Sequence, residues 1–393
     1  MPKHSVWWPA RRLAVFAGVP LVTLGLAAGP NAAPSGDRQV LSGPSVAIYD
    51  LAGRVTVESG TGTDVVVEVT RGGADAEQLE IERGMVGNWQ TMRVVFPGNR
   101  IVYRDRDTKS WSDWGGWGGT QIHVGEDGRF SDESLVGGHG HRRQVRISGR
   151  GNGLEAHADL RVRVPKGKTL ALFLAVGECS VTNVDGDLRV DVASASVTTR
   201  GTRGSLWIDA GSGELRVSEA TGDVVLDTGS GGSTVRGLRG AKLSLDTGSG
   251  GVTLSDIEVD LLRADTGSGS VEIEDLKAAD IGLDTGSGSV RMSLLPGPLE
   301  SLMIDSGSGG VTLSVPPGID ADFDVDTGSG GIDINVPHRV IESERDHVRG
   351  TFGEGRGRIR IETGSGGVRI NPRAASGARQ RGGVGKLIGL TFV

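Results

Sequence analysis

Cysteine is almost missing from this sequence of 393 residues, and aromatic side chains are scarce. A single cysteine, Cys179, cannot form an intramolecular disulfide, so a disulfide-stapled scaffold is excluded. It lies in an apolar run, LFLAVGECSV, which favours a small buried residue over a reactive thiol. Phe, Trp and Tyr together make up 4% of the chain. A core would therefore consist mainly of Val, Leu and Ile, which suits narrow β-structure.

The chain also lacks an excess of basic charge and, outside the segment 1–33, any hydrophobic run of membrane-spanning length. The formal net charge is −7, which argues against nucleic acid as a partner. A P-loop, a dinucleotide fingerprint and a nucleophile-elbow motif are all absent from the sequence. We therefore expect no small-molecule cofactor.

Residues 1–33 have the pattern of an export signal peptide. Basic residues precede an apolar run from Leu13 to Ala28, and small residues suited to a cleavage site occur at 27–29 and 32–33. We expect an exported protein that is periplasmic, secreted or on the cell surface. A membrane attachment is expected only if this leader is retained.

Glycine is abundant, with 66 residues, and much of it recurs in one phrase, Asp-Thr-Gly-Ser-Gly. The phrase or a near copy begins at successive spacings of 18, 19, 19, 19, 21, 21 and 36 residues, at Asp209, Asp227, Asp246, Asp265, Asp284, Asp305, Asp326 and Glu362. A fixed period of this length is typical of a repeat architecture. Apolar residues lie two apart on both sides of the phrase, as in Leu243 and Leu245, or Val252 and Leu254, and this is the period of a strand.

The period and the alternation together predict an all-β fold, a parallel β-helix or β-solenoid with coils of about 19 residues. Each unit is too small to bury its own apolar face, so the units must stack into a shared core. The crossover rule favours a right-handed winding. At each corner, we expect glycine to supply backbone angles that a β-carbon forbids, and the aspartate to accept hydrogen bonds from backbone N–H groups.

The sequence predicts a linear organisation in which an irregular β region caps one end of the solenoid. The predicted segments are a signal peptide at 1–33, a linker at 34–41, an N-terminal β region at 42–169 with a Trp/Gly-rich loop insert at 104–143, the repeat solenoid at 170–371, and a C-terminal tail at 372–393. The widest spacing between copies of the phrase would hold either one degenerate coil or a loop from about Pro337 to Gly357.

The candidate binding residues are three tryptophans of the insert. Trp111, Trp114 and Trp117 lie among glycines and charged residues, and an exposed aromatic cluster normally has a use. The alternative is that they fold back as a lid over the first coil.

The sequence offers two weak indications of a metal site. The repeated aspartates could form a ladder that binds calcium, because stacked carboxylates repel one another unless a cation bridges them. His123, His139 and His141 could approach one another, but they lack the spacing of a zinc site. No metal ligand is assigned.

The phrase Asp-Thr-Gly-Ser also occurs at the active site of aspartic proteases, where two aspartates share a proton. That chemistry requires two copies from two halves of a barrel brought face to face. Copies in coils stacked side by side do not meet this requirement, so no catalytic residue is assigned.

Several of these motifs together resemble the DUF4097 family, described as adhesins with β-strand repeats. They are Gly53-Arg-Val-Thr-Val57, the Val-Pro-Lys-Gly turn at 164–167, the DTGSGGVTL-like corners, and the closing stretch from Gly350 to Ile370. The resemblance covers about residues 45–371 and leaves out the Trp-rich insert. It implies an exported, envelope-associated solenoid without established catalytic residues.

These observations favour an exported, adhesin-like β-solenoid that serves as a non-catalytic structural or binding module of the cell envelope. Its ligand would be a cell-surface or cell-wall polymer or a protein. One alternative is a polysaccharide-active β-helix enzyme, because β-helices often present acidic residues on one face. Another is an envelope-stress sensor domain, which would need a retained N-terminal helix.

Overall fold

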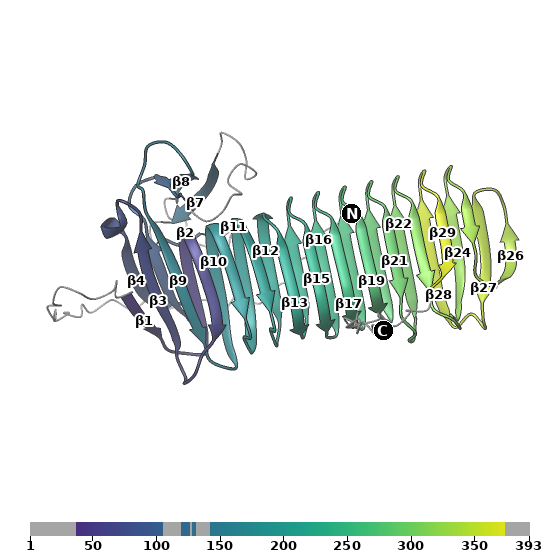
Figure 1. Cartoon of the computed structure of the whole chain (residues 1–393), viewed down its shortest axis with the longest axis horizontal. Coiled ribbons are helices and arrows are strands. Elements are labelled where there is room, and N and C mark those ends of the chain that lie inside the picture. The colour runs from purple at the N-terminus through teal and green to yellow at the C-terminus, as the bar shows by residue number, and fades with distance from the viewer. Residues whose placement is uncertain (1–36, 105–118, 126–127, 131–141, 374–393) are drawn as a thin grey trace, which may run out of the picture. The chain divides into compact units, whose positions relative to one another are not determined.

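The computed structural model of the chain describes residues 37–104, 119–125, 128–130 and 142–373 (Figure 1). Most of these residues form β-strands, and the only helix among them is a short 3-10 turn, η1 (Ala76–Gln78). The prediction of an all-β, mostly parallel fold is confirmed. The chain forms two compact units, Met1–Thr234 and Val235–Val393. Within the described residues, no helix has the length and apolar character needed to cross a membrane.

The first unit is built around its three longest strands, β2, β10 and β11. The strands of this unit are β1 (Asp37–Leu41), β2 (Ser45–Ser59), β3 (Val65–Gly72), β4 (Glu80–Val86), β5 (Trp89–Val95), β6 (Arg100–Val102), β7 (Thr120–Gly125), β8 (Arg142–Ser148), β9 (His157–Val164), β10 (Lys168–Thr182), β11 (Gly186–Arg200), β12 (Leu206–Ser212), β13 (Leu215–Thr221) and β14 (Val224–Thr228).

Strand β10 lies between β2 and β11 and pairs with both in parallel. Cys179 of β10 is opposite Val55 on one side and Val197 on the other, and it is fully buried. Burial, with a smaller contribution from the charge of Glu178, raises the pKa of this thiol to about 12. The interpretation of Cys179 as a small buried residue is confirmed.

Parts of the predicted N-terminal organisation differ from the structure. The segment expected to be a linker forms β1, which pairs antiparallel with β3 and buries Leu41 completely. The loop insert at 104–143 contains a strand, β7, which pairs with β8 and buries Val124. Parallel coil pairing already begins at β2, inside the region expected to be an irregular cap. Strand β7 alternates apolar and polar residues, whereas β1 has only Val40 and Leu41 as apolar residues, so its pairing with β3 was not evident from the pattern.

The second unit contains the regular repeats. Its strands are β15 (Ser233–Arg239), which begins just before the unit boundary, β16 (Lys242–Thr247), β17 (Val252–Glu258), β18 (Leu261–Thr266), β19 (Val271–Lys277), β20 (Asp280–Thr285), β21 (Val290–Leu294), β22 (Ser301–Ser306), β23 (Val311–Val315), β24 (Ala321–Thr327), β25 (Ile332–Ile334), β26 (Arg339–Ser343), β27 (His347–Phe352), β28 (Gly357–Thr363) and β29 (Val368–Pro372).

Each coil of this unit gives one strand to each of two parallel ladders. The strand before the phrase joins the ladder β16–β18–β20–β22–β28–β24, and the strand after it joins β17–β19–β21–β23–β29–β25. Equivalent aliphatic and aromatic side chains stack between the ladders as a continuous core. One such column is almost completely buried and consists of Leu243, Leu262, Ile281, Leu302, Ile359 and Phe323.

The corner glycines have a different role from the one expected. Gly269 and Gly288 do not adopt the left-handed backbone region, so backbone angles do not explain them. A β-carbon on Gly288 would come within 1.8 Å of the carbonyl oxygen of Gly269 in the preceding coil. Glycine is needed because the stacked turns approach one another too closely for any side chain.

The hydrogen bonds of the corner are made by the threonine of the phrase, and this corrects the expectation that the aspartate makes them. Thr285 is fully buried, accepts a bond from the N–H of Gly288 at 3.0 Å, and donates to the carbonyl of Gly269 in the preceding coil at 3.2 Å. Thr266 makes the equivalent pair of bonds. The aspartates point to the outer face because strand alternation places them opposite the threonines.

The last coils do not stack in the order of the sequence. Strands β28 and β29 insert between the coil β22/β23 and the coil β24/β25 (Figure 1). The intervening residues form an antiparallel hairpin, β26–β27, whose strand β27 covers the edge of β24. The widest spacing between copies of the phrase therefore holds neither the degenerate coil nor the loop that was expected.

Charge complementarity favours this order. Strand β24 carries Asp322 and Asp324, which lie opposite Arg358 and Arg360 of the inserted β28. On its other side, Asp324 accepts a hydrogen bond of 2.9 Å from Nε2 of His347 in β27. Opposite charges on neighbouring strands stabilise their pairing, so an acidic strand is best placed between two strands that carry cationic side chains.

Candidate functional groove

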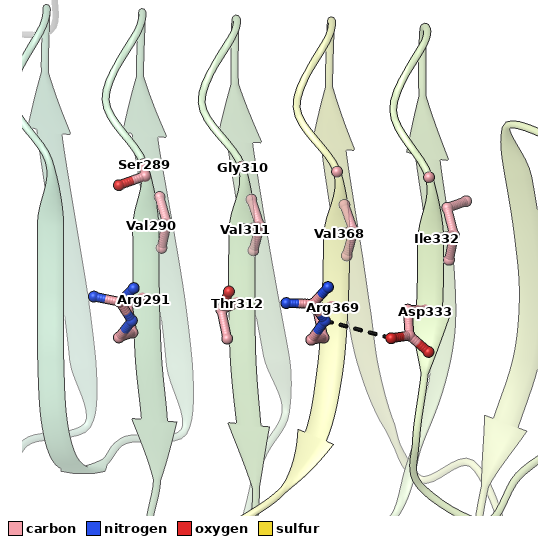
Figure 2. A pocket seen from close by; sticks show the side chains of 12 residues that line it. Ser289, Val290, Arg291, Gly310, Val311, Thr312, Ile332, Asp333, Val368 and Arg369 are labelled. Carbon is pink, nitrogen blue, oxygen red and sulfur yellow. Dashed lines mark hydrogen bonds and ion pairs between the residues drawn. The ribbon is translucent and has the colours of Figure 1, made fainter.

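A groove of about 490 Å³ crosses the outer face of the second unit at its last four coils (Figure 2). It takes three consecutive residues from each coil and is lined by Ser289, Val290 and Arg291, by Gly310, Val311 and Thr312, by Gly367, Val368 and Arg369, and by Gly331, Ile332 and Asp333. In space these coils follow the strand order β21–β23–β29–β25. The groove therefore runs across the strands, from coil to coil.

Missing side chains make this groove. The residue that follows the phrase is Gly310, Gly367 or Gly331 in three neighbouring coils, and Ser289 in the fourth. Backbone hydrogen bonds hold these positions level, including Val311 N–H to Gly367 O and Val368 N–H to Gly331 O, both 2.9 Å. A row of glycines leaves a trough, because no β-carbon rises above the pleated backbone.

Polar side chains form the row beside the glycines. Arg291, Thr312, Arg369 and Asp333 are in register on adjacent strands. They point outward because the valines and isoleucines before them point into the core. Arg369 and Asp333 form an ion pair with an Nε–Oδ2 distance of 3.3 Å, visible in Figure 2.

Both arginines of the groove remain largely accessible. The side chain of Arg291 is 73% exposed and that of Arg369 is 60% exposed. Arg291 has a long ion pair of 3.8 Å with Glu272 of the preceding coil. Exposed ion pairs are weak, so either guanidinium can exchange its partner for an anionic ligand.

The other outer face of the second unit carries a row of carboxylates. Asp246, Asp265, Asp284, Asp305, Glu362 and Asp326 occupy equivalent positions on successive strands. Burial is the main cause that raises the pKa of Asp265, followed by the charges of Asp246 and Asp284. Burial and the charge of Asp305 raise the pKa of Asp284.

This row does not converge into a metal cluster. Within the residues that the structure describes, no three His, Cys, Asp or Glu side chains are grouped so that they could hold a metal ion. The carboxylates follow one another at the spacing of the coils, about 4.8 Å. Calcium binding along the row stays a prediction.

The residues singled out from the sequence are not among the described residues that line the groove. Trp111, Trp114 and Trp117 lie outside the described residues, as do His139 and His141. His123 is exposed on β7. The groove residues were missed because residues of the same types occur at the equivalent positions of other repeats. The available signal was the residue that follows the phrase, which is Ser270 and Ser289 in two successive repeats and glycine in the next three, at Gly310, Gly331 and Gly367.

Comparison with known proteins places the chain in a family. No curated protein matches it significantly. A crystal structure described as a putative cell adhesion protein from Clostridium sporogenes matches with 12% sequence identity and a TM-score of 0.18, covering 86% of this chain and 100% of the other. A family model described as Toastrack DUF4097 matches residues 138–371, more than half of the sequence. The chain therefore belongs to the DUF4097 family.

Proposed function

We propose that the protein is an exported, non-catalytic binding module of the cell envelope, and that its groove binds a linear acidic polysaccharide. The observation that carries the proposal is the glycine-floored groove across β21, β23, β29 and β25. The export signal predicted at residues 1–33 supports the proposed location outside the cytoplasm.

The periodicity of the groove suits a repetitive polymer. Neighbouring coils repeat at about 4.8 Å, so equivalent groups recur along the groove at a constant interval. A linear polysaccharide also presents equivalent groups at a constant interval. A shallow trough of backbone and small residues can accept such a chain lengthwise, with the same contact made in each coil.

The charges of the groove favour an acidic ligand. Arg291 and Arg369 lie two strands apart, with Thr312 between them. This separates their backbones by about 10 Å. A guanidinium binds a carboxylate through two parallel hydrogen bonds, and a hydroxyl can donate to a sugar oxygen. Uronic-acid units would therefore be bound at alternate positions along the groove.

Recognition is a better fit to these residues than hydrolysis. Glycoside hydrolases use a pair of carboxyl groups on opposite sides of the scissile bond. The described residues that line the groove include one carboxylate, Asp333, which is paired with Arg369. A protein ligand with a repeated acidic strand remains the alternative occupant.

The test fills the groove with a side chain that the fold tolerates. A β-carbon on Gly331 meets no atom within 4 Å, so Gly331→Leu should fold normally and block the trough. Gly251 occupies the equivalent position, directly after the phrase, in a coil outside the groove. A β-carbon added there would make only an ordinary van der Waals contact, so Gly251→Leu is the matched control. Binding would be measured against linear polysaccharides with and without carboxylates, and reducing ends would be assayed in parallel.

We expect a carboxylated polysaccharide to bind the wild type and the control equally, and Gly331→Leu at least about tenfold more weakly. If the wild type releases reducing ends, the protein is a polysaccharide-active enzyme and the proposal of a non-catalytic binding module is wrong. Equal binding by all three proteins, or binding to no polysaccharide, would contradict the proposed site.

A further inference from the structure

Strand β26 has a free edge at the end of its sheet in the second unit. It pairs with β27 on one side, and the described residues provide no strand on its other side (Figure 1). All five of its residues are exposed. Val340 is 52% exposed and Ile341 is 58% exposed, which is unusual for large apolar side chains. A free edge with apolar side chains is a template for pairing with another strand.

The hairpin that carries this edge is firmly held. Strand β27 pairs with β24 along its whole length, from Ala321↔Phe352 to Asp326↔His347. Phe352 is 1% exposed and packs on Phe323 with a ring-centroid distance of 4.5 Å. The hydroxyl of Thr351 donates to Asp322 at 2.9 Å. The edge is therefore presented in a fixed position and loses little conformational freedom when a strand pairs with it.

The sequence of this edge is complementary to itself. It reads Arg339-Val340-Ile341-Glu342, a cation, two apolar residues and an anion. In an antiparallel pair centred between Val340 and Ile341, each arginine lies opposite the glutamate of the other copy, and each valine lies opposite an isoleucine. Opposite charges and β-branched pairs at facing positions stabilise antiparallel strands.

Both charged residues are available for this pairing. Within the described residues, neither Arg339 nor Glu342 forms an ion pair or a side-chain hydrogen bond. Glu342 lies opposite Arg349 of β27, but this arginine is also opposite Asp324 of β24, so the two carboxylates share one cation. A partner with the same short sequence would satisfy both charges at once, which is why the edge suits a second copy of this chain.

The edge also has features that limit what can join it. Pro337 lies just before the strand, and the register with β27 shifts between Val340 and Glu342. The shift places a bulge at Ile341, inside the proposed paired segment, so the contact with another strand is short and weak. A two-fold antiparallel pair uses the free edge of β26 in both copies, so this contact closes at a dimer.

We propose that two copies of this chain associate through their β26 strands, paired antiparallel about the Val340–Ile341 step. The contact is short and well below the area of a standard stable interface, so the dimer is weak and depends on concentration. It would join two binding grooves in one assembly, which raises the avidity for a polymer that spans both. The pairing itself does not depend on the proposed ligand.

The test uses charge reversal on the full chain, with sedimentation measured over a range of concentrations. Arg339→Glu and Glu342→Arg each place like charges opposite one another, so each variant should be monomeric where the wild type dimerises. The double variant R339E/E342R restores opposite charges and should dimerise again. An equimolar mixture of the two single variants should form a heterodimer, because each then supplies the charge that the other needs.

The rescue separates pairing from damage to the hairpin. Glu342 is one of the carboxylates that raise the pKa of His347, so its replacement alone could loosen the hairpin. If the substitution only loosened the hairpin, mixing it with the other single variant would not restore dimerisation. If it broke the charge pairing between copies, the mixture would restore it. The proposal is overturned by a wild type that stays monomeric at about millimolar concentration, by single variants that dimerise like the wild type, or by absence of the heterodimer.

Discussion

At the scale of single residues, the repeated phrase divides its work between two adjacent side chains. The threonine is buried and ties each corner to the preceding coil, as Thr285 does with Gly288 and Gly269. The aspartate before it is exposed and faces its equivalents in the neighbouring coils. One residue of the phrase therefore stabilises the stack, and its neighbour is a source of repulsion.

Replacing the threonine hydroxyl should weaken the stack. Thr285→Val keeps the shape but leaves the buried Gly288 N–H and Gly269 carbonyl without this partner, which typically costs about 1–3 kcal/mol. Thr285→Ser keeps the hydroxyl, as Ser306 does in the next coil, and should cost much less. Urea unfolding monitored by circular dichroism measures the difference. Equal loss in both variants would mean that methyl packing, and not the hydrogen bonds, is decisive.

The aspartate row should make stability depend on pH. The pKa values of Asp265 and Asp284 are raised above the ordinary 3.8, so the folded state binds protons more tightly than the unfolded state. The stabilisation is complete below the ordinary pKa and is lost as pH rises through the raised pKa. Asp265→Asn should therefore gain about 0.2–1 kcal/mol over the wild type at neutral pH, the usual size of a cross-strand charge effect.

This gain should disappear at about pH 3, where the wild-type carboxyl is protonated. Glu274→Gln is the control, because it removes one negative charge from the same coil at a position that faces Ser255 of the preceding coil and not another carboxylate. Thermal melting of both variants across pH measures the effect. An equal gain in the control would show that net charge, and not the row, is responsible.

At the scale of elements, the main finding is the position of the coil β28/β29. The segments 321–334 and 357–370 carry nearly the same apolar columns, and either could stack on the coil β22/β23. The acidic side chains of β24 are instead opposite arginines of β28, and Asp333 is paired with Arg369. This placement also brings Arg369 next to Thr312 and so completes the groove.

Cross-linking should report this order directly. Neighbouring strands are about 4.8 Å apart, within the reach of a disulfide, whereas strands two apart are about 10 Å apart and beyond it. The pair Thr312→Cys and Arg369→Cys should cross-link under mild oxidation, as should Arg369→Cys with Asp333→Cys. The pair Thr312→Cys and Asp333→Cys should not, and its efficient cross-linking would indicate stacking in sequence order. Cys179 is buried and should not interfere.

At the scale of the whole molecule, the sequence combines an N-terminal export pattern with a DUF4097 region that matches the family over residues 138–371. Its formal net charge is −7, and a net negative charge is unfavourable for binding nucleic acid. Binding outside the cytoplasm requires that the leader direct export, so the function proposed for the groove depends on the segment 1–33.

The export pattern predicts a shortened mature chain. Mass spectrometry of the protein recovered outside the cytoplasm should find an N-terminus between about residue 28 and residue 34. Leu21→Arg with Leu24→Arg interrupts the apolar run and should retain the full-length protein in the cytoplasm. An exported protein that keeps Met1 would instead support a membrane anchor and the sensor alternative.

The sequence by itself determined the coil, the two faces of each strand and the family. The repeat period and the alternation of apolar and polar residues are local properties, and stacking of identical units follows from the need to bury each apolar face. The repeat period and the alternation also identified the corner. They did not show which residue of the phrase makes the hydrogen bonds of that corner. That depended on which side chain the pleat turned inward.

Tertiary structure alone decided the order of the last coils, the hairpin β26–β27 and the groove. These features depend on contacts between segments far apart in the chain, such as Thr312 with Arg369 and Asp324 with His347. When two segments have equivalent apolar columns, the periodicity of the sequence cannot predict which of them stacks on a given coil. Only facing charges, and the room that glycines leave between stacked coils, distinguish one arrangement from another.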